Sequence, residues 1–448
     1  MAMLNISGIG SGLDWKALIQ EIVKLERRPV EKARSQETRL DERRNAWKDI
    51  RSRLETLQSR LDDLKDQGVF GARKTSSADE TVLKAEAGST AAKASYFVTV
   101  TNLAEAHRAA SDRQADRAAA LNLAGTFSLN GADITVGAAD SLTDIRDEIN
   151  GIAGIGVTAS IIDNRLVLTS DTVGAAGTMA VLDDPSTLIL ESLGVLVDQG
   201  GSKVLKNEMA AARDAAFTVD GLSVTRANND PDDVIPGVTL HLLAGSAAPV
   251  VLKVEDDPGT ATEAIRQFTD QYNSAMDLID TALGEKGKLA GDVTLMRIRM
   301  NLRQFVSGKV TGMSGTYQAL IDAGIGTTGR GHTLAIDTAK LEQALKNAPA
   351  TVEDLLFHED AGIDGVGEKL ESYLDLLIDA ENALIPAKED GLTARIKNVQ
   401  TRIRDLDYRL QLREQNLTRQ FVALERSLAI LQGQSVELGW GTGSNKGQ

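Results

Sequence analysis

The stretch between Leu392 and Gln432 contains no glycine and no proline, and it repeats an apolar residue at every seventh position. The repeating residues are Ile396, Ile403, Leu410, Leu417, Leu424 and Leu431. A second series fills the other core position of the first heptads with Leu392, Val399 and Leu406. Apolar residues at this period keep facing a partner helix only if the two helices wind around each other. At a rise of about 1.5 Å per residue the helix would be about 60 Å long, so we predict a projecting rod.

A matching segment lies near the other end of the chain. No glycine or proline occurs between Pro29 and Gly68, which gives a second helix of about 57 Å. Its two heptad series are Leu40, Trp47, Leu54 and Leu61, and Ile50, Leu57 and Leu64. Long periodic segments without caps favour coiled coils, so we predict that the two segments pair antiparallel and join the two ends of the chain. The alternative is two ordinary surface helices of a bundle.

Composition excludes several classes of protein. Lys plus Arg is 49 and Asp plus Glu is 64, so the formal net charge is −15, which argues against nucleic acid or an anionic membrane as the partner. The absence of cysteine excludes disulfides and thiolate sites. We find neither an apolar run long enough to insert in a membrane nor a signal peptide. The chain is therefore expected to be cytoplasmic or to leave the cell by a route that needs no such peptide.

The middle of the chain has the composition of β structure. Asn130-Gly131 lies between alternating apolar residues, which predicts a tight hairpin. The segment Phe217–Thr225 repeats Phe127–Thr135 at the phenylalanine, the glycine and the closing threonine. Hairpins often look alike, but this repeat favours two related β-rich domains, one inserted in the other. An alanine-rich patch at 103–117 is expected to be helical.

These observations predict an α+β multidomain chain. It has an antiparallel terminal coiled-coil rod, a helical collar with a small β patch, and two β-rich head domains, one inserted in the other. The predicted boundaries are 1–74 for the N-terminal segment and rod helices, 75–105 with 205–258 for the first head, 106–204 for the inserted outer head, 259–387 for the collar, and 388–448 for the C-terminal rod helix and tail.

No group of residues predicts catalysis, a metal site or a cofactor site. The four histidines are far apart in sequence, and none has a partner at metal-ligand spacing. The run Gly324–Gly329 matches a dinucleotide fingerprint, but a strand-like segment follows it where the motif requires a helix. Asn228 and Asp230 alternate as in a calcium loop, but Asp233 stands where that loop needs glycine. We therefore expect no cofactor and no enzymatic activity.

Several segments, taken in order, resemble one family, the bacterial flagellar filament cap proteins, also called flagellar hook-associated protein 2. The segments near the N-terminus and in the heads are Gly8–Asp14, Leu25–Pro29, Trp47, Phe97–Ala106, Ser141–Ser160 and Phe217–Gly221. The later segments are Val234–Leu240, Leu320–Ile325, Leu334–Asp337, Val352–Phe357 and Arg419–Glu425. The segment at 172–213 matches least.

The resemblance implies a structural protein at the tip of the flagellum. It implies a homo-oligomeric ring of about four to six copies, with the heads forming a plate and the terminal rods forming legs. The implied partners are flagellin, the hook–filament junction proteins and an export chaperone. It also implies an extracellular location, reached by the flagellar type III route without a cleaved signal peptide.

The second apolar series stops after Leu406, where Arg413 and Gln420 take its place and Phe421 and Leu428 begin a neighbouring stripe. We predict that Phe421 and Leu428 contact another subunit or the filament. Two other functions stay open from the sequence. The chain could be another flagellar axial protein at the hook–filament junction, or a surface adhesin whose β head binds a host glycan or protein.

Overall fold

The computed structural model describes residues 14–66, 68–327, 333–358, 362–379 and 383–440. The chain divides into two compact units. The first contains residues 1–65, 262–344 and 351–448, and the second contains residues 66–261 and 345–350. The first unit is mainly helical and the second is mainly β-sheet, as the predicted α+β class requires.

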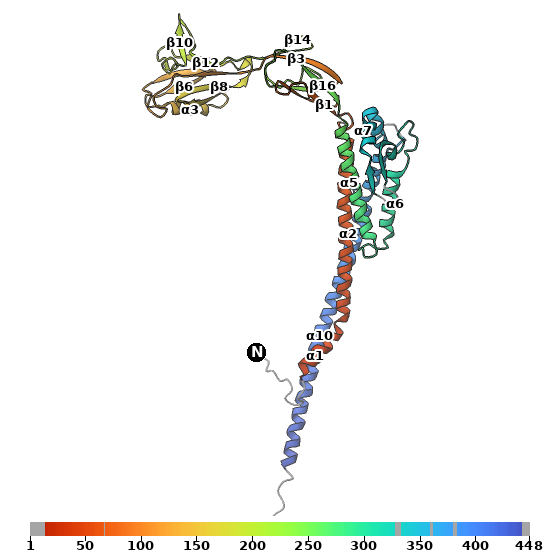
Figure 1. The fold of residues 1–448 in the computed structure, drawn as a ribbon. Coiled ribbons are helices and arrows are strands. Elements are labelled where there is room, and N and C mark those ends of the chain that lie inside the picture. The colour runs from red at the N-terminus through yellow and green to blue at the C-terminus, as the bar shows by residue number, and fades with distance from the viewer. Residues whose placement is uncertain (1–13, 67, 328–332, 359–361, 380–382, 441–448) are drawn as a thin grey trace, which may run out of the picture. The chain divides into compact units, whose positions relative to one another are not determined.

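Long helices dominate the first unit. Its principal helices are α1 (Trp15–Glu26), α2 (Arg28–Lys65), α5 (Pro258–Leu283), α6 (Val293–Ser307), α7 (Thr338–Asn347), α8 (Pro349–Leu356), α9 (Val366–Ile378) and α10 (Leu384–Trp440). The short helix η2 (Leu320–Ala323) and the two-stranded sheet of β17 (Ile325–Thr327) and β18 (Leu334–Ile336) complete it. Figure 1 shows α2 and α10 running alongside each other, and α9 also packs against α2.

Local chemistry fixes where the long helices begin. Asp14 caps α1, because its carboxylate accepts a hydrogen bond from the backbone N–H of Ala17 at 3.1 Å. Pro29 lies in the first turn of α2, where the missing N–H would have had no helical partner. Pro386 lies in the first turn of α10 in the same way. Helix α1 therefore ends at its C-cap Arg27, and α2 begins at the next residue with Pro29 in its first turn.

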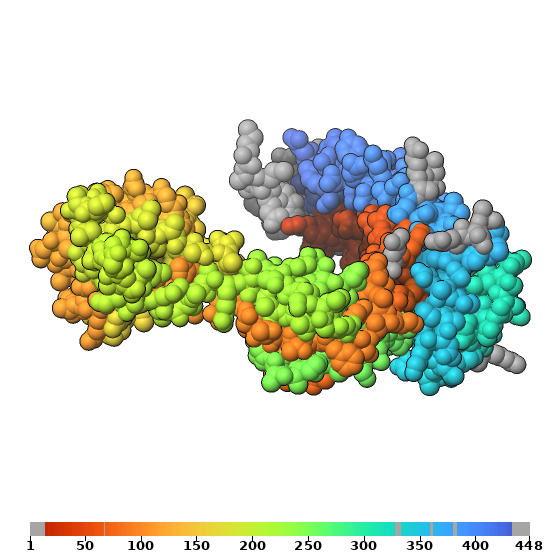
Figure 2. All heavy atoms as spheres, turned by 90° about the horizontal axis from the view of Figure 1, so that it is seen from above, coloured from red at the N-terminus to blue at the C-terminus, as the bar shows by residue number. Residues whose placement is uncertain are grey.

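The first core of the second unit lies between a five-stranded antiparallel sheet and a two-stranded sheet. The strand orders are β1-β16-β3-β13-β14 and β15-β2. The strands are β1 (Arg73–Ser77), β2 (Leu83–Ala87), β3 (Ala94–Asn102), β13 (Ala215–Val219), β14 (Leu222–Arg226), β15 (Val238–Leu242) and β16 (Val250–Asp256). Strands from before residue 105 and from after residue 210 therefore pair in one sheet, and Figure 2 shows their orange and green atoms in one lobe.

A separate core is formed by the residues between these two groups of strands. Its sheets have the orders β12-β4-β8-β7, β6-β5-β9 and β10-β11. The strands are β4 (Ala106–Ala110), β5 (Gly125–Leu129), β6 (Ala132–Val136), β7 (Val157–Ile162), β8 (Arg165–Val173), β9 (Val181–Asp183), β10 (Leu196–Gln199), β11 (Ser202–Leu205) and β12 (Asn207–Ala210). Helices α3 (Leu142–Gly151), η1 (Ala175–Gly177) and α4 (Ile189–Ser192) complete this part. The buried side chains of this core run from Ala109 to Leu196.

The two predicted hairpins are confirmed. Strands β5 and β6 pair across Asn130 (φ 50°) and Gly131 (φ 83°), and β13 and β14 pair across Asp220 (φ 50°) and Gly221 (φ 82°). Positive φ at both central residues is the geometry of the type I′ turn, which matches the twist of the strands. The two corresponding phenylalanines, Phe127 and Phe217, are each buried in one of the two β cores.

The helix expected in the alanine-rich patch is wrong. Residues 106–110 form the strand β4, which lies between β12 and β8. His107 and Ala109 face inward while Arg108 is exposed, so the segment has the period of a half-buried strand. Tertiary pairing overrides the weak helix preference of its alanines.

Candidate functional site in the paired terminal helices

The rod is built on a continuous apolar seam. On α2 the predicted core residues Trp47, Ile50, Leu54, Leu57, Leu61 and Leu64 are all buried. On α10 the buried members are Leu392, Ile396, Val399 and Leu417. Leu40, Ile403, Leu406 and Leu410 are half-buried. Burial is most complete in the second half of α2, because α9 packs there in addition to α10.

Polar pairs along the seam show that α2 and α10 are antiparallel. Arg51 faces Glu389 with nitrogen and oxygen 3.5 Å apart. Gln400 donates a hydrogen bond to Glu37 at 2.8 Å, and Arg34 pairs with Asp407 at 3.4 Å. The partner numbers rise along α10 as they fall along α2, so the two ends of the chain lie on one rod.

The collar end of the rod is tied by side chains of α9. Lys65 binds Glu371 at 2.9 Å, and this hydrogen bond raises the pKa of the Lys65 ammonium. Gln58 donates to Asp375 at 2.7 Å and to Asp379 at 3.0 Å. Partial burial raises the pKa of Asp62, and the nearby Glu371 carboxylate adds to that effect. These contacts fix the second half of α2 against the collar.

The assignment of Leu424 and Leu431 to the core of the rod does not hold within the chain. Their side chains are 45% and 60% exposed. Beyond Leu410 the partner of α10 is α1 and no longer α2, because the N-terminal helical segment is interrupted at Arg27. Helix α1 lies against a stripe that includes Leu417 but turns away from the sevenfold series after it, so Leu424 and Leu431 face no partner helix in the described part of the chain.

Phe421 belongs to the stripe that α1 covers. Its ring stacks on Trp15 of the same chain, with centroids 4.6 Å apart and planes inclined by 23°. The Trp15 indole N–H donates a hydrogen bond to Glu425, whose side chain is almost fully buried. Leu428, one turn farther along, is half-buried. Heptad analysis missed Trp15, and the only local signal was an aromatic residue directly after a helix cap.

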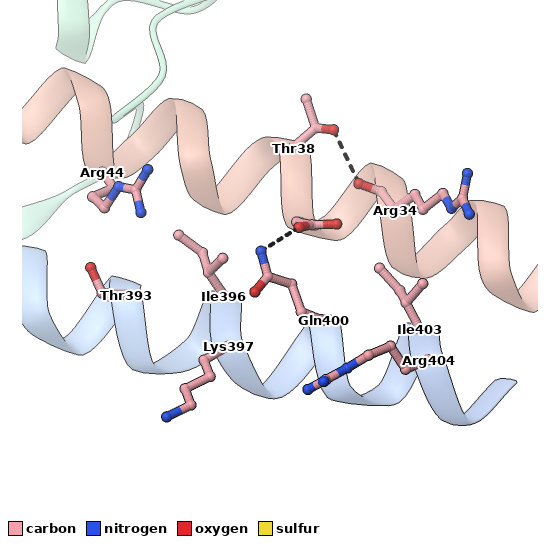
Figure 3. A pocket seen from close by; sticks show the side chains of 10 residues that line it. Arg34, Thr38, Arg44, Thr393, Ile396, Lys397, Gln400, Ile403 and Arg404 are labelled. Carbon is pink, nitrogen blue, oxygen red and sulfur yellow. Dashed lines mark hydrogen bonds between the residues drawn. The ribbon is translucent and has the colours of Figure 1, made fainter. Parts of the chain in front are cut away.

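An open groove runs between α2 and α10 at the middle of the rod. In Figure 3 the side chains of Ile396 and Ile403 point toward α2, and Gln400 reaches across to the α2 carboxylate that accepts its hydrogen bond. The charged residues that line this groove are Arg34, Arg44, Lys397, Arg404 and the single acid Glu37.

A second groove lies where α1 meets α2, and we call it the elbow groove. Its apolar lining is Leu25, Pro29, Val30, Leu406 and Leu410, and its charged lining is Glu26, Arg28, Arg409 and Arg413. Both grooves are open channels along the helix pair. Neither has the enclosed shape of a small-molecule site.

The described part of the chain offers no group of three or more His, Asp or Glu side chains placed to hold a metal ion. His241 pairs with Asp230 at 2.7 Å, and His107 is buried beside Glu208 at 3.1 Å. His332 and the end of the run Gly324–Gly329 lie outside the described residues. In the same part of the chain no helix combines the length and apolarity of a membrane span.

Three family models match the chain. The model of the flagellar hook-associated protein 2 N-terminus matches residues 11–107, and the model of its C-terminus matches residues 212–433. The flagellin hook IN motif matches residues 124–172, within the second β core. The last match includes Ser141–Ser160, one of the segments whose sequence resembles the cap family.

Relatives and solved structures agree with these models. The chain is 30% identical over 453 residues to the B-type flagellar hook-associated protein 2 of Pseudomonas aeruginosa PAO1, covering 94% of this chain and 93% of that protein. It is 26% identical to flagellar hook-associated protein 2 of Escherichia coli K12, covering 89% of each. The crystal structure of the D1-D2-D3 domains of the Escherichia coli flagellar cap protein FliD superposes with a TM-score of 0.61 at 26% identity, covering 78% of this chain and 99% of that one. The chain therefore belongs to the flagellar hook-associated protein 2 family, the family of the flagellar cap proteins.

Proposed function

We propose that this chain is a structural subunit of the cap at the distal tip of the bacterial flagellar filament. Copies assemble in a ring, with about four to six subunits. The ring prevents loss of flagellin monomers and promotes their folding and insertion as the filament elongates. The residues at 75–105 and 205–258 form one head domain, and residues 106–204 form an outer head inserted in it.

The observation on which the proposal rests is the paired terminal helices. The family models match residues 11–107 and 212–433, which include α2 and most of α10, and these two helices pair in one antiparallel rod. A long helix pair of this kind offers an extended surface for contacts with other proteins. We infer that it forms the leg of the cap subunit, and that the protein has neither a cofactor nor an enzymatic role.

Exposed apolar side chains near the end of α10 support a contact with a partner protein. Val422 is 55% exposed, and Leu424 and Leu431 are also exposed. Large exposed apolar residues that cluster on one segment mark interaction sites. We infer that this segment, with Leu428 and the free edge of Phe421, contacts a neighbouring subunit or the filament end.

The remaining partners and the location follow from the same proposal. The protein reaches the flagellum tip by the flagellar type III route, without a cleaved signal peptide and without inserting in a membrane. An export chaperone keeps the apolar stripe of the C-terminal helix soluble until then. Flagellin and the hook–filament junction proteins are its partners after export.

The test compares flagellin in the culture medium with flagellin in attached filaments in a deletion strain. We expect soluble flagellin in the medium, hooks without filaments, and restoration of filaments by the gene supplied in trans. Filaments of normal length in the deletion strain would contradict the capping function. If the hook–filament junction is also missing in the deletion strain, that result would instead indicate a junction protein.

A further inference from the structure

The elbow groove is an apolar channel that the chain leaves open. Leu25 is 58% exposed, and Leu406 and Leu410 are half-buried, although Val30 beneath them is almost fully buried. Pro29, in the first turn of α2, lines one wall of the channel. An exposed leucine beside two half-buried leucines provides apolar surface for a third helix. Such a helix would pack with its axis about 8–10 Å from its neighbours.

The rim of this groove is cationic. Glu26 is its only acidic lining residue, and Arg413 already pairs with it at 3.4 Å. Arg28 and Arg409 are exposed, and neither has an ion-pair partner among the residues that the structure describes. The groove therefore presents two uncompensated positive charges beside its apolar floor.

The cationic rim is opposite in sign to the net charge of the whole chain. Residues 14–65 contain 14 Lys or Arg and 11 Asp or Glu, and residues 384–440 contain nine and seven. The terminal helices are thus net positive in a chain whose formal charge is −15. Complementary charge selects partners and speeds their encounter, so this surface favours an acidic partner.

We propose that the elbow groove binds an amphipathic helix of a partner protein, with leucine-like residues on one face and Asp or Glu on its flanks. The apolar face contacts Leu25, Leu406 and Leu410, and the acidic flanks pair with Arg28 and Arg409. This is the helix-in-groove mode of recognition, read by apolar residues at positions i, i+3 or i+4, and i+7. The inference rests on the proposed function, in which the terminal rod engages another protein.

The first experiment measures peptide binding to the full chain by fluorescence anisotropy. One labelled peptide of about five helical turns has a leucine stripe flanked by glutamates, and its twin has lysines in place of the glutamates. We expect the acidic peptide to bind at least tenfold more tightly than its twin, and its affinity to fall as salt is added. Equal binding of the two peptides would overturn the proposal.

Variants assign the binding to this groove. Arg28→Glu with Arg409→Glu should weaken binding of the acidic peptide at least tenfold, and Leu25→Ser should weaken it severalfold. Arg402→Glu is the matched control, because Arg402 is an exposed cation of the same helix that lines neither groove. Circular dichroism checks that each variant keeps its helices. Unchanged binding by the double arginine variant would contradict the proposal.

Complementation of the deletion strain separates this inference from the proposed function. If both are right, the Arg28→Glu, Arg409→Glu variant restores fewer filaments than Arg402→Glu and releases more flagellin. If the double variant restores normal filaments in a strain that otherwise has none, the inference is wrong and the capping function stands. If the deletion strain itself builds normal filaments, capping is wrong, and the peptide assay still decides the chemistry of the groove.

Discussion

At the scale of single residues, Trp15 determines where α1 lies. Its ring stacks on Phe421 and its indole N–H is satisfied by Glu425, so both the apolar and the polar part of the side chain have a partner on α10. Stacked aromatic pairs contribute about 0.5–1.5 kcal/mol beyond the area they bury. Ile19 is the only residue of α1 that is fully buried, so this pair is a large share of what holds the helix.

We expect Phe421→Ala to release α1 while leaving the rest of the rod intact. Loss of the half-buried ring removes about 1–3 kcal/mol of apolar and stacking contact. Hydrogen exchange followed by mass spectrometry should then show amides 15–26 exchanging at least tenfold faster, with α2 unchanged. Val422→Ala is the control, since Val422 is 55% exposed. Unchanged exchange in α1 would show that Trp15 does not depend on this ring.

The role of a residue could be predicted wherever its interactions are with its neighbours in the sequence. Asn130-Gly131 predicts its hairpin because only a few residue types adopt positive φ at both positions of the turn. The pairing of Trp15 with Phe421 and Glu425 is different, since more than 400 positions of sequence separate the partners. A single sequence contains no signal that joins residues so far apart.

At the scale of elements, the heptad pattern predicts that a long helix has a stripe but does not say which helix covers it. The prediction holds from Leu392 to Leu417, and it fails at Leu424 and Leu431, where α1 has replaced α2 on another face of α10. The alanine-rich strand β4 failed for a related reason, because its neighbours β8 and β12 decide its conformation.

We expect Leu54→Ala to destabilise the rod strongly and Leu424→Ala to leave it almost unchanged. Leu54 is fully buried on α2, so the substitution leaves a cavity and costs about 2–5 kcal/mol. Leu424 is exposed, and its replacement should change stability by less than about 0.5 kcal/mol. Thermal unfolding followed by circular dichroism at the helical band compares the two. Equal losses would mean that Leu424 is covered in solution, for example by a second copy.

At the scale of the whole molecule, the order of rod helix, β domains, collar and rod helix was predictable from composition and periodicity. The resemblance to the cap family added the function, which no single residue indicates. Neither approach reveals the elbow groove, because its walls come from both ends of the chain and its open leucines look like ordinary heptad positions. Such a groove becomes visible only once the helices are placed side by side.

We expect a chain that ends before Leu384 to lose more helix than α10 alone. Most helical stability in proteins comes from packing of an apolar face, so α2 should lose structure when its partner is absent. The loss of helical signal should approach that of α1, α2 and α10 together. A chain that lacks only residues 1–27 should lose little beyond α1. A loss in the first truncation limited to α10 itself would contradict this coupling.

The antiparallel pairing of α2 with α10 also determines the order in which parts of the chain can fold. Lys65 and Leu384 are 319 positions apart, so α2 is synthesised long before the helix that covers it, and closing so large a loop is slow. Both β cores lie inside that loop and are complete without α10. A chain that has not yet reached α10 can therefore have folded sheets while the apolar stripe of α2 is still exposed. Proteases and chaperones recognise such exposed apolar segments. The helix pair of the rod can thus form only after α10 has been synthesised.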